Sequence, residues 1–140
     1  MIPGWHEIFE HTADLGLRVR AGSFALLCEE AARGLTGVIA GDTAAIRPVV
    51  TETICVAGTE PIWLLFDLLS ELLATFDLRR MLFAECRVSR TPEGLRAECR
   101  GETFDPARHQ LAHEVKAITQ HELDVHQTVA GWEATLILDI

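Results

Sequence analysis

The chain has 140 residues, of which 49% are hydrophobic, so it can build one buried core but is too short for two domains of ordinary size. We therefore expect one domain over residues 1–140. Its 21 acidic and 12 basic side chains give a net charge of −9. The negative charge argues against tight direct binding to a nucleic-acid backbone and favours binding of cations or basic partners.

The N-terminal segment lacks the basic region and long apolar core of a signal peptide. The longest apolar run, residues 62–66, is far too short to span a bilayer. Four cysteines lie in apolar stretches without the spacing of a zinc site: Cys28, Cys55, Cys86 and Cys99. We therefore expect buried free thiols in a reducing compartment, and a cytoplasmic protein that does not bind membranes.

The first half of the chain predicts two strands and two helices. Residues 15–20 alternate apolar and polar side chains, which indicates a half-buried strand. Ser23 fits the N-cap of a helix over residues 24–38, where apolar residues recur at helical spacing. A strand rich in β-branched residues follows at 49–56. A second helix begins near residue 59 or 60, has Pro61 in its first turn and carries a broad apolar face typical of a helix that lies across a sheet.

The second half predicts strands only. Residues 81–90 and 95–102 form a hairpin around a Thr-Pro-Glu-Gly turn, and an irregular loop follows over 104–113. Extended segments cover 114–128, and an alternating strand over 132–139 comes last. Short connections favour antiparallel pairing. The expected fold is therefore α+β, a mostly antiparallel β-sheet system with two packed α-helices in a single domain.

Two aspartates at opposite ends of the chain, Asp14 and Asp139, lie where predicted strands begin or end. An Asx turn is the local alternative for Asp14, whereas Asp139 is followed by Ile140 with its free carboxylate. If the last strand pairs near the first, three anionic groups converge, which is costly unless a cation neutralises them or they take up protons. Oxygen ligands of this kind suit calcium or magnesium.

Two further side chains are candidates for this site. His11 stands among polar neighbours and could serve as a metal ligand or an acid/base, although a hydrogen-bonded structural role is equally open. An imidazole ligand would shift the preference towards zinc. Lys116 is the only lysine beside eleven arginines and could pair with a carboxylate of the site, the alternative being an ordinary surface lysine.

Nothing in the sequence supports catalysis by a nucleophile or a phosphate-binding loop. The chain has no P-loop, no Gly-x-Ser-x-Gly elbow and no zinc-protease motif at His109 and His113. A metal-dependent phosphoester hydrolase that uses the same carboxylates, and a chaperone-like binding module with a structural cation, are the functional alternatives that the residues leave open.

Four segments in order resemble the archease family: Glu-His-Thr-Ala-Asp-Leu-Gly-Leu at 10–17, Gly-Glu-x-x-Asp at 101–105, Lys-Ala-x-Thr-x-His at 116–121 and the closing strand at 132–140. The resemblance covers essentially the whole chain. It departs at Gln120, where the family usually has an aromatic residue, and in the second helix at 67–73, where the family commonly has Trp and Asn.

The resemblance implies a non-enzymatic role. Archeases are accessory proteins of RtcB-type RNA ligases, which join RNA ends in tRNA splicing and RNA repair. This protein would promote guanylylation of the ligase and restore its multiple turnover without catalysing ligation. The family binds a divalent cation, often assigned as calcium, and the matching ligands here would be Asp14, Asp139 and Ile140.

Overall fold

The structure is a computed structural model that describes residues 2–11 and 13–140. Its elements in chain order are β1 (Trp5–His11), β2 (Asp14–Ala21), α1 (Phe24–Ala40), the short 3₁₀ helix η1 (Thr43–Ala45), β3 (Val50–Ala57), α2 (Pro61–Arg79), β4 (Met81–Thr91), β5 (Gly94–Thr103), β6 (Ala117–Thr128) and β7 (Gly131–Asp139). The predicted α+β class with two helices and antiparallel strands is confirmed.

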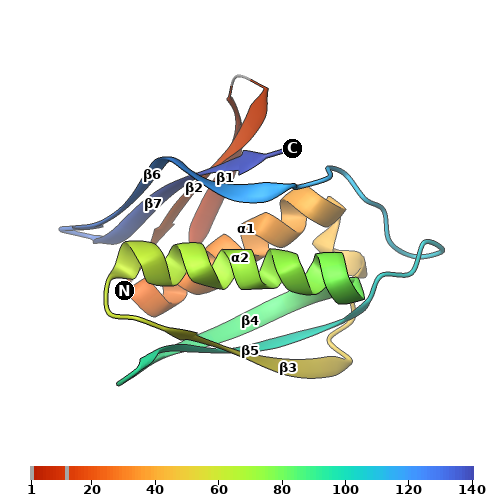
Figure 1. The fold of residues 1–140 in the computed structure, drawn as a ribbon, viewed down its shortest axis with the longest axis horizontal. Helices are drawn as coiled ribbons and strands as arrows, with labels where there is room; N and C mark the ends of the chain where they lie inside the picture. The colour runs from red at the N-terminus through yellow and green to blue at the C-terminus, as the bar shows by residue number, and fades with distance from the viewer. Residues whose placement is uncertain (1, 12) are drawn as a thin grey trace.

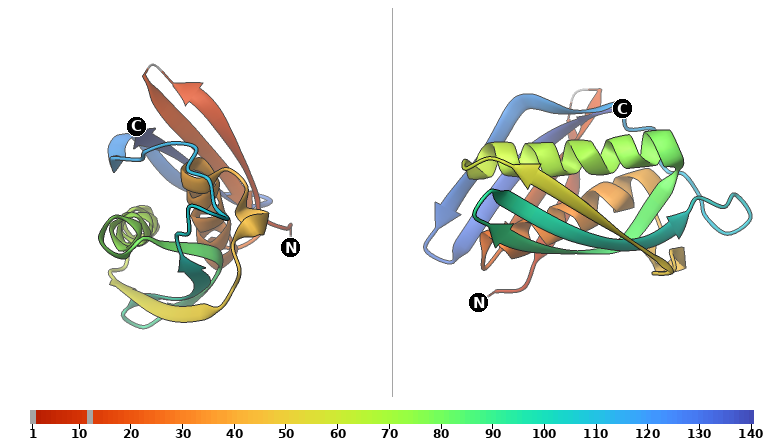
Figure 2. Two further views of the ribbon diagram at one scale, coloured as in Figure 1. Left: turned by 90° about the vertical axis from the view of Figure 1, so that its right-hand side faces the viewer. Right: turned by 60° about the horizontal axis from the view of Figure 1, so that its bottom comes forward.

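The strands form two separate sheets with both helices between them (Figure 1). One sheet has the order β1-β2-β7-β6, and the other has the order β3-β5-β4. Helix α1 contacts both β4 and β2, while α2 contacts β6 and β3, so each helix bridges the two sheets. Figure 2 shows this arrangement from two further sides. The sequence predicted the strands and helices but not their division into two layers.

The two helices begin as the sequence predicts. The Ser23 side chain caps α1 by accepting a hydrogen bond from the amide of Leu26. Helix α2 starts at Pro61, which needs no amide partner in the first turn. The apolar face of α2 is buried between the sheets and consists of Leu64, Leu65, Leu68, Leu69, Leu72, Leu73 and Phe76. None of the helices within the described residues is long and apolar enough to cross a membrane.

The predicted hairpin is present as β4 and β5, with Cys86 directly opposite Cys99. A bulge between Phe83 and Glu85 shifts the register and brings the β4 backbone close to Gly101. A Cβ atom at Gly101 would lie only 1.8 Å from the carbonyl oxygen of Leu82. Only glycine fits where two backbones approach this closely.

Two details differ from the sequence-based prediction. Strand β1 was not predicted, because its apolar residues do not alternate cleanly and, as an edge strand, it leaves Trp5 and Ile8 exposed. Cys28, Cys86 and Cys99 are buried free thiols as expected, but the prediction was wrong for Cys55, which is exposed on β3. Strand β3 is the edge of its sheet, so an apolar side chain there need not face the core.

Candidate cation site at the end of the four-stranded sheet

The strand register brings the predicted site residues into one row across the sheet. His11 on β1 is opposite Asp14 on β2. Leu15 is opposite Leu138, so the next pair outward is Asp14 and Asp139. On its other side, Asp139 is opposite Ala117 of β6. Residues directly opposite each other in antiparallel strands share a face, so His11, Asp14 and Asp139 lie side by side on one face of the sheet.

A hollow of about 460 Å³ opens at this end of the sheet. Its lining residues come from the β1–β2 hairpin, from the loop before β6 and from the last residue of the chain: Glu10, His11, Ala13, Asp14, Leu15, His113 and Ile140. Asp14 is partly exposed, with 27% of its side-chain surface accessible, so a hydrated ion can reach it. Asp139 is not among the lining residues and is adjacent to the hollow only through its register with Asp14 and its bond to Ile140. Carboxylate oxygens such as those of Asp14, Asp139 and the chain terminus are the donors that a hard cation prefers.

His11 lies between two carboxylates. Its Nε2 atom is 2.9 Å from Oε2 of Glu122, while its Nδ1 atom is 4.0 Å from Oδ2 of Asp14. Nδ1 is buried and has no hydrogen-bond partner among the described residues. The ring of His121 packs edge-on against that of His11, with 5.7 Å between centroids. The sequence singled out His11 but missed Glu122 and His121 as neighbours of the site.

A bulge in β6 places Glu122 and His121 next to His11. The register between β6 and β7 shifts between Thr119 and Asp124, so four residues of β6 stand against one residue of β7. Glu122 within the bulge has a backbone φ of +53°, in the left-handed region that non-glycine residues seldom adopt. The only signal in the sequence was the break in the alternating pattern between residues 120 and 123.

Lys116 approaches the site through its backbone. Its amide donates a hydrogen bond of 2.7 Å to the carbonyl oxygen of Asp139 and so fixes the end of β7 against the segment before β6. Its side chain is exposed. None of the ion pairs formed within residues 2–11 and 13–140 includes Lys116, so the structure does not bring its ammonium to a carboxylate.

The Gly-Glu-x-x-Asp segment fixes the start of the loop that leads to the site. The Glu102 carboxylate accepts a 2.5 Å hydrogen bond from the amide of Arg47, pairs with the Arg108 guanidinium and lies 3.3 Å from Nε2 of the buried His109. The Arg47 amide, followed by the Arg108 and His109 donors, lowers the pKa of Glu102 to about 2. Nδ1 of His109 accepts from the Asp105 amide at 2.8 Å. Glu102, Arg108 and His109 therefore hold the start of this loop against the Arg47 backbone, and we call these three residues the loop clamp.

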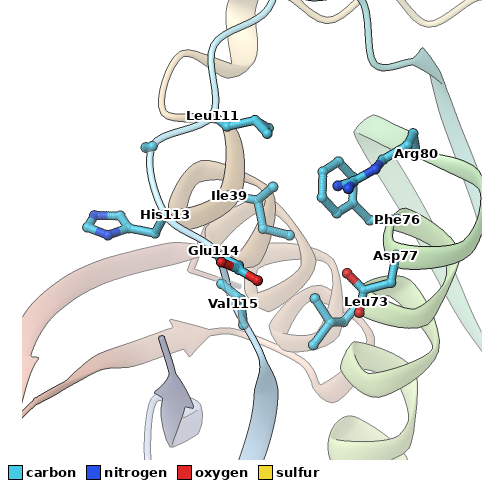
Figure 3. A pocket seen from close by; sticks show the side chains of 10 residues that line it. Ile39, Leu73, Phe76, Asp77, Arg80, Leu111, His113, Glu114 and Val115 are labelled. Atoms are coloured by element: carbon cyan, nitrogen blue, oxygen red, sulfur yellow. The ribbon is translucent and has the colours of Figure 1, made fainter.

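A second hollow of about 370 Å³ lies between the end of α2, the end of α1 and the same loop (Figure 3). Its lining residues are Ile39, Leu73, Phe76, Asp77, Arg80, Leu111, Ala112, His113, Glu114 and Val115. The Arg80 guanidinium stacks on the Phe76 ring, 4.9 Å from its centroid. His113 lines both hollows, so the loop over 111–115 separates the two.

Fold and site together define a small α+β protein, with two helices between antiparallel sheets and two aspartates, Asp14 and Asp139, at neighbouring positions where strands β2 and β7 pair. Residues 6–140 match the model of the "Archease protein family (MTH1598/TM1083)". The chain belongs to the archease family.

Relatives and one solved structure are similar to this chain along nearly its whole length. Protein archease of Methanopyrus kandleri is 36% identical over 140 residues, covering 97% of this chain and 99% of the relative. Protein archease of Methanosarcina acetivorans is 32% identical, covering 96% and 95%. The solution structure of protein 1598 of Methanobacterium thermoautotrophicum is similar with a TM-score of 0.80 at 26% identity, covering 96% of this chain and 98% of that one.

A more distant structure shares the fold alone. The crystal structure of a Thermotoga maritima archease, described as a possible chaperone, has a TM-score of 0.64 at 20% identity and covers 94% of each chain.

Proposed function

We propose that this protein is a non-enzymatic activator of an RtcB-type RNA ligase of tRNA splicing and RNA repair. In this role it promotes guanylylation of the ligase and restores its multiple turnover. The proposal rests on membership of the archease family together with one structural observation, the strand register that places Asp14 at the position opposite Asp139, at the end of the sheet where Asp14 and Ile140 line one hollow.

The proposed cation site uses Asp14, Asp139 and Ile140 as ligands, with calcium as the expected ion. A bound divalent cation would supply the positive charge that offsets this concentration of carboxylates. The residues of the chain do the remaining work. Asp14 comes from the β1–β2 hairpin, and Lys116 holds the end of β7 through its backbone, so shared ligation would fix the hairpin and the chain terminus relative to each other.

The charge of the protein supports a protein partner over direct RNA contact. A net charge of −9 repels a phosphate backbone, whereas a ligase that holds RNA must present basic surface. The activator would therefore meet the ligase through electrostatic complementarity in the cytoplasm, leaving RNA recognition to the ligase.

The test is ligation by a purified RtcB-type ligase under multiple-turnover conditions, with and without this protein. We expect wild type to raise turnover and the guanylylated fraction of the ligase. Asp139→Asn should weaken activation at least about tenfold, because replacing even a residue that only hydrogen-bonds to a metal ligand lowers metal affinity at least about tenfold. Asp67→Asn, which changes an exposed aspartate of α2, is the matched control and should activate normally. Normal activation by Asp139→Asn would refute the role of this site.

The same preparations separate the alternatives. A phosphoester hydrolase would turn over substrate with Mg²⁺ or Mn²⁺ in the absence of ligase, and Asp139→Asn would abolish that activity. A chaperone-like module would suppress aggregation of unrelated clients without any ligase. We expect neither activity from the protein alone.

A further inference from the structure

The cluster beside the proposed calcium ligands has a different chemistry. One ligand atom from each of His11, His121 and Glu122 lies within 4.8 Å of the others. We propose that these three side chains form a second cation site that binds a transition-metal ion such as Zn²⁺. Two imidazoles and one carboxylate favour zinc, cobalt or nickel over calcium, because nitrogen ligands suit these softer ions.

The three side chains are close to ligating geometry. Nε2 of His11 and Oε2 of Glu122 are 2.9 Å apart, in direct contact with each other. Ligands about 2.0–2.2 Å from a tetrahedral zinc ion stand about 3.4 Å apart. The His11 and Glu122 atoms must therefore separate by about 0.5 Å, and the His121 nitrogen, within 4.8 Å of both, must move inward by at most about 1.4 Å. His121 and Glu122 are exposed, and a side-chain rotation achieves this without moving the core.

The second nitrogen of His11 lies near a carboxylate that can orient the ring when a metal is bound. Histidines that bind a metal through one ring nitrogen typically direct the other N–H to a carboxylate or carbonyl oxygen. Nδ1 of His11 is buried, has no hydrogen-bond partner in the described part of the chain and faces Oδ2 of Asp14 at 4.0 Å. A metal on Nε2 would place the proton on Nδ1, where Asp14 can accept it.

The backbone at Glu122 points to the same site. Its φ of +53° lies in a region that non-glycine residues occupy mainly where the surrounding structure or a ligand requires it. The β6 bulge that contains Glu122 turns this edge strand towards His11, on the opposite edge strand of the sheet. The site would thus join the two edges of the sheet over its outer face.

The chain contains a matched control for this arrangement. His126, also on β6, lies 2.6 Å from Asp124 and 3.5 Å from Glu133. These residues form an exposed imidazole–carboxylate group of similar composition with only one histidine. A lone imidazole beside surface carboxylates should bind a transition metal far more weakly than the paired imidazoles of His11 and His121.

Co²⁺ provides the test, because its visible absorption reports nitrogen and oxygen ligation directly. The titration uses the full-length chain carrying Cys55→Ser, which removes the exposed thiol as a competing ligand. We expect one equivalent of Co²⁺ to give a saturable visible band that Zn²⁺ displaces. His121→Ala and Glu122→Gln should each weaken binding at least about tenfold, whereas His126→Ala should leave it unchanged.

The calcium ligands give an independent comparison. Asp139→Asn should abolish calcium binding while Co²⁺ binding persists, and His121→Ala should have the opposite effect. Failure of ligase activation therefore leaves this inference standing. The inference is overturned if wild type gives no saturable band, if His121→Ala and Glu122→Gln bind Co²⁺ as wild type does, or if His126→Ala weakens binding as much as they do.

Discussion

Replacing Gly101 with alanine should destabilise the protein more than almost any other single-methyl addition. The new Cβ would lie 1.8 Å from the carbonyl oxygen of Leu82 and 2.7 Å from the Cα of Phe83, both backbone atoms. Ordinary contact begins near 3.4 Å, so β4 and β5 would have to separate by about 1.6 Å, breaking ladder hydrogen bonds at the bulge. We expect a cost at the upper end of overpacking, about 3 kcal/mol.

Urea and thermal unfolding measure this cost. For a chain of this length, about 3 kcal/mol corresponds to a fall in Tm of about 10 °C. Gly37→Ala is the control, because a Cβ there meets nothing within 4 Å and the position lies inside α1. It should stabilise the protein by about 0.5–1 kcal/mol through helix propensity. A Gly101→Ala protein within about 0.5 kcal/mol of wild type would refute the steric reasoning.

Three further predictions concern the clamp, the thiols and a helix cap. The pKa of Glu102 in the folded protein is about 2, below its ordinary value of 4.5. Its carboxylate therefore stabilises the folded state fully above pH 4.5, and this stabilisation is lost as the pH falls from 4.5 towards 2. Urea unfolding from pH 2.5 to 7 should therefore show a smaller acid loss for Glu102→Gln, and an unchanged profile would contradict the clamp. A thiol reagent should modify only Cys55 in the native protein, and Cys55→Ser should abolish that reaction; burial raises the pKa of Cys28 to about 12. Ser23→Ala should cost about 1 kcal/mol in urea unfolding, and no measurable loss would mean that the cap is dispensable.

The elements that the sequence predicted well are those with strong local signals. The turn before Gly94, the cap at Ser23 and the proline at Pro61 all lie where a particular residue type satisfies a particular backbone geometry. Strand β1 lacked such a signal because an edge strand with one exposed side needs no clean alternation. The division into two sheets depends on which strands pair over long distances, and periodicity carries no information about that.

The candidate site was predictable only in part for the same reason. Asp14 and Asp139 each stand at the end of a clear strand, so pairing of the first and last predicted strands was enough to bring them together. His121 and Glu122 reach His11 through a bulge in β6 that depends on the register with β7. Alternation predicts strands, whereas a register shift follows from packing of the whole sheet.

The two sheets also differ in how far apart along the chain their strands lie. Strands β3, β4 and β5 come from one continuous stretch, whereas the other sheet joins residues 5–21 to residues 117–139. Closing the four-stranded sheet therefore carries a larger entropic cost than closing the three-stranded one, and we expect its pairing to form later in folding. Asp14 and Asp139 become neighbours only when β2 pairs with β7, so we expect a chain in which this sheet has not yet formed to lack the proposed cation site.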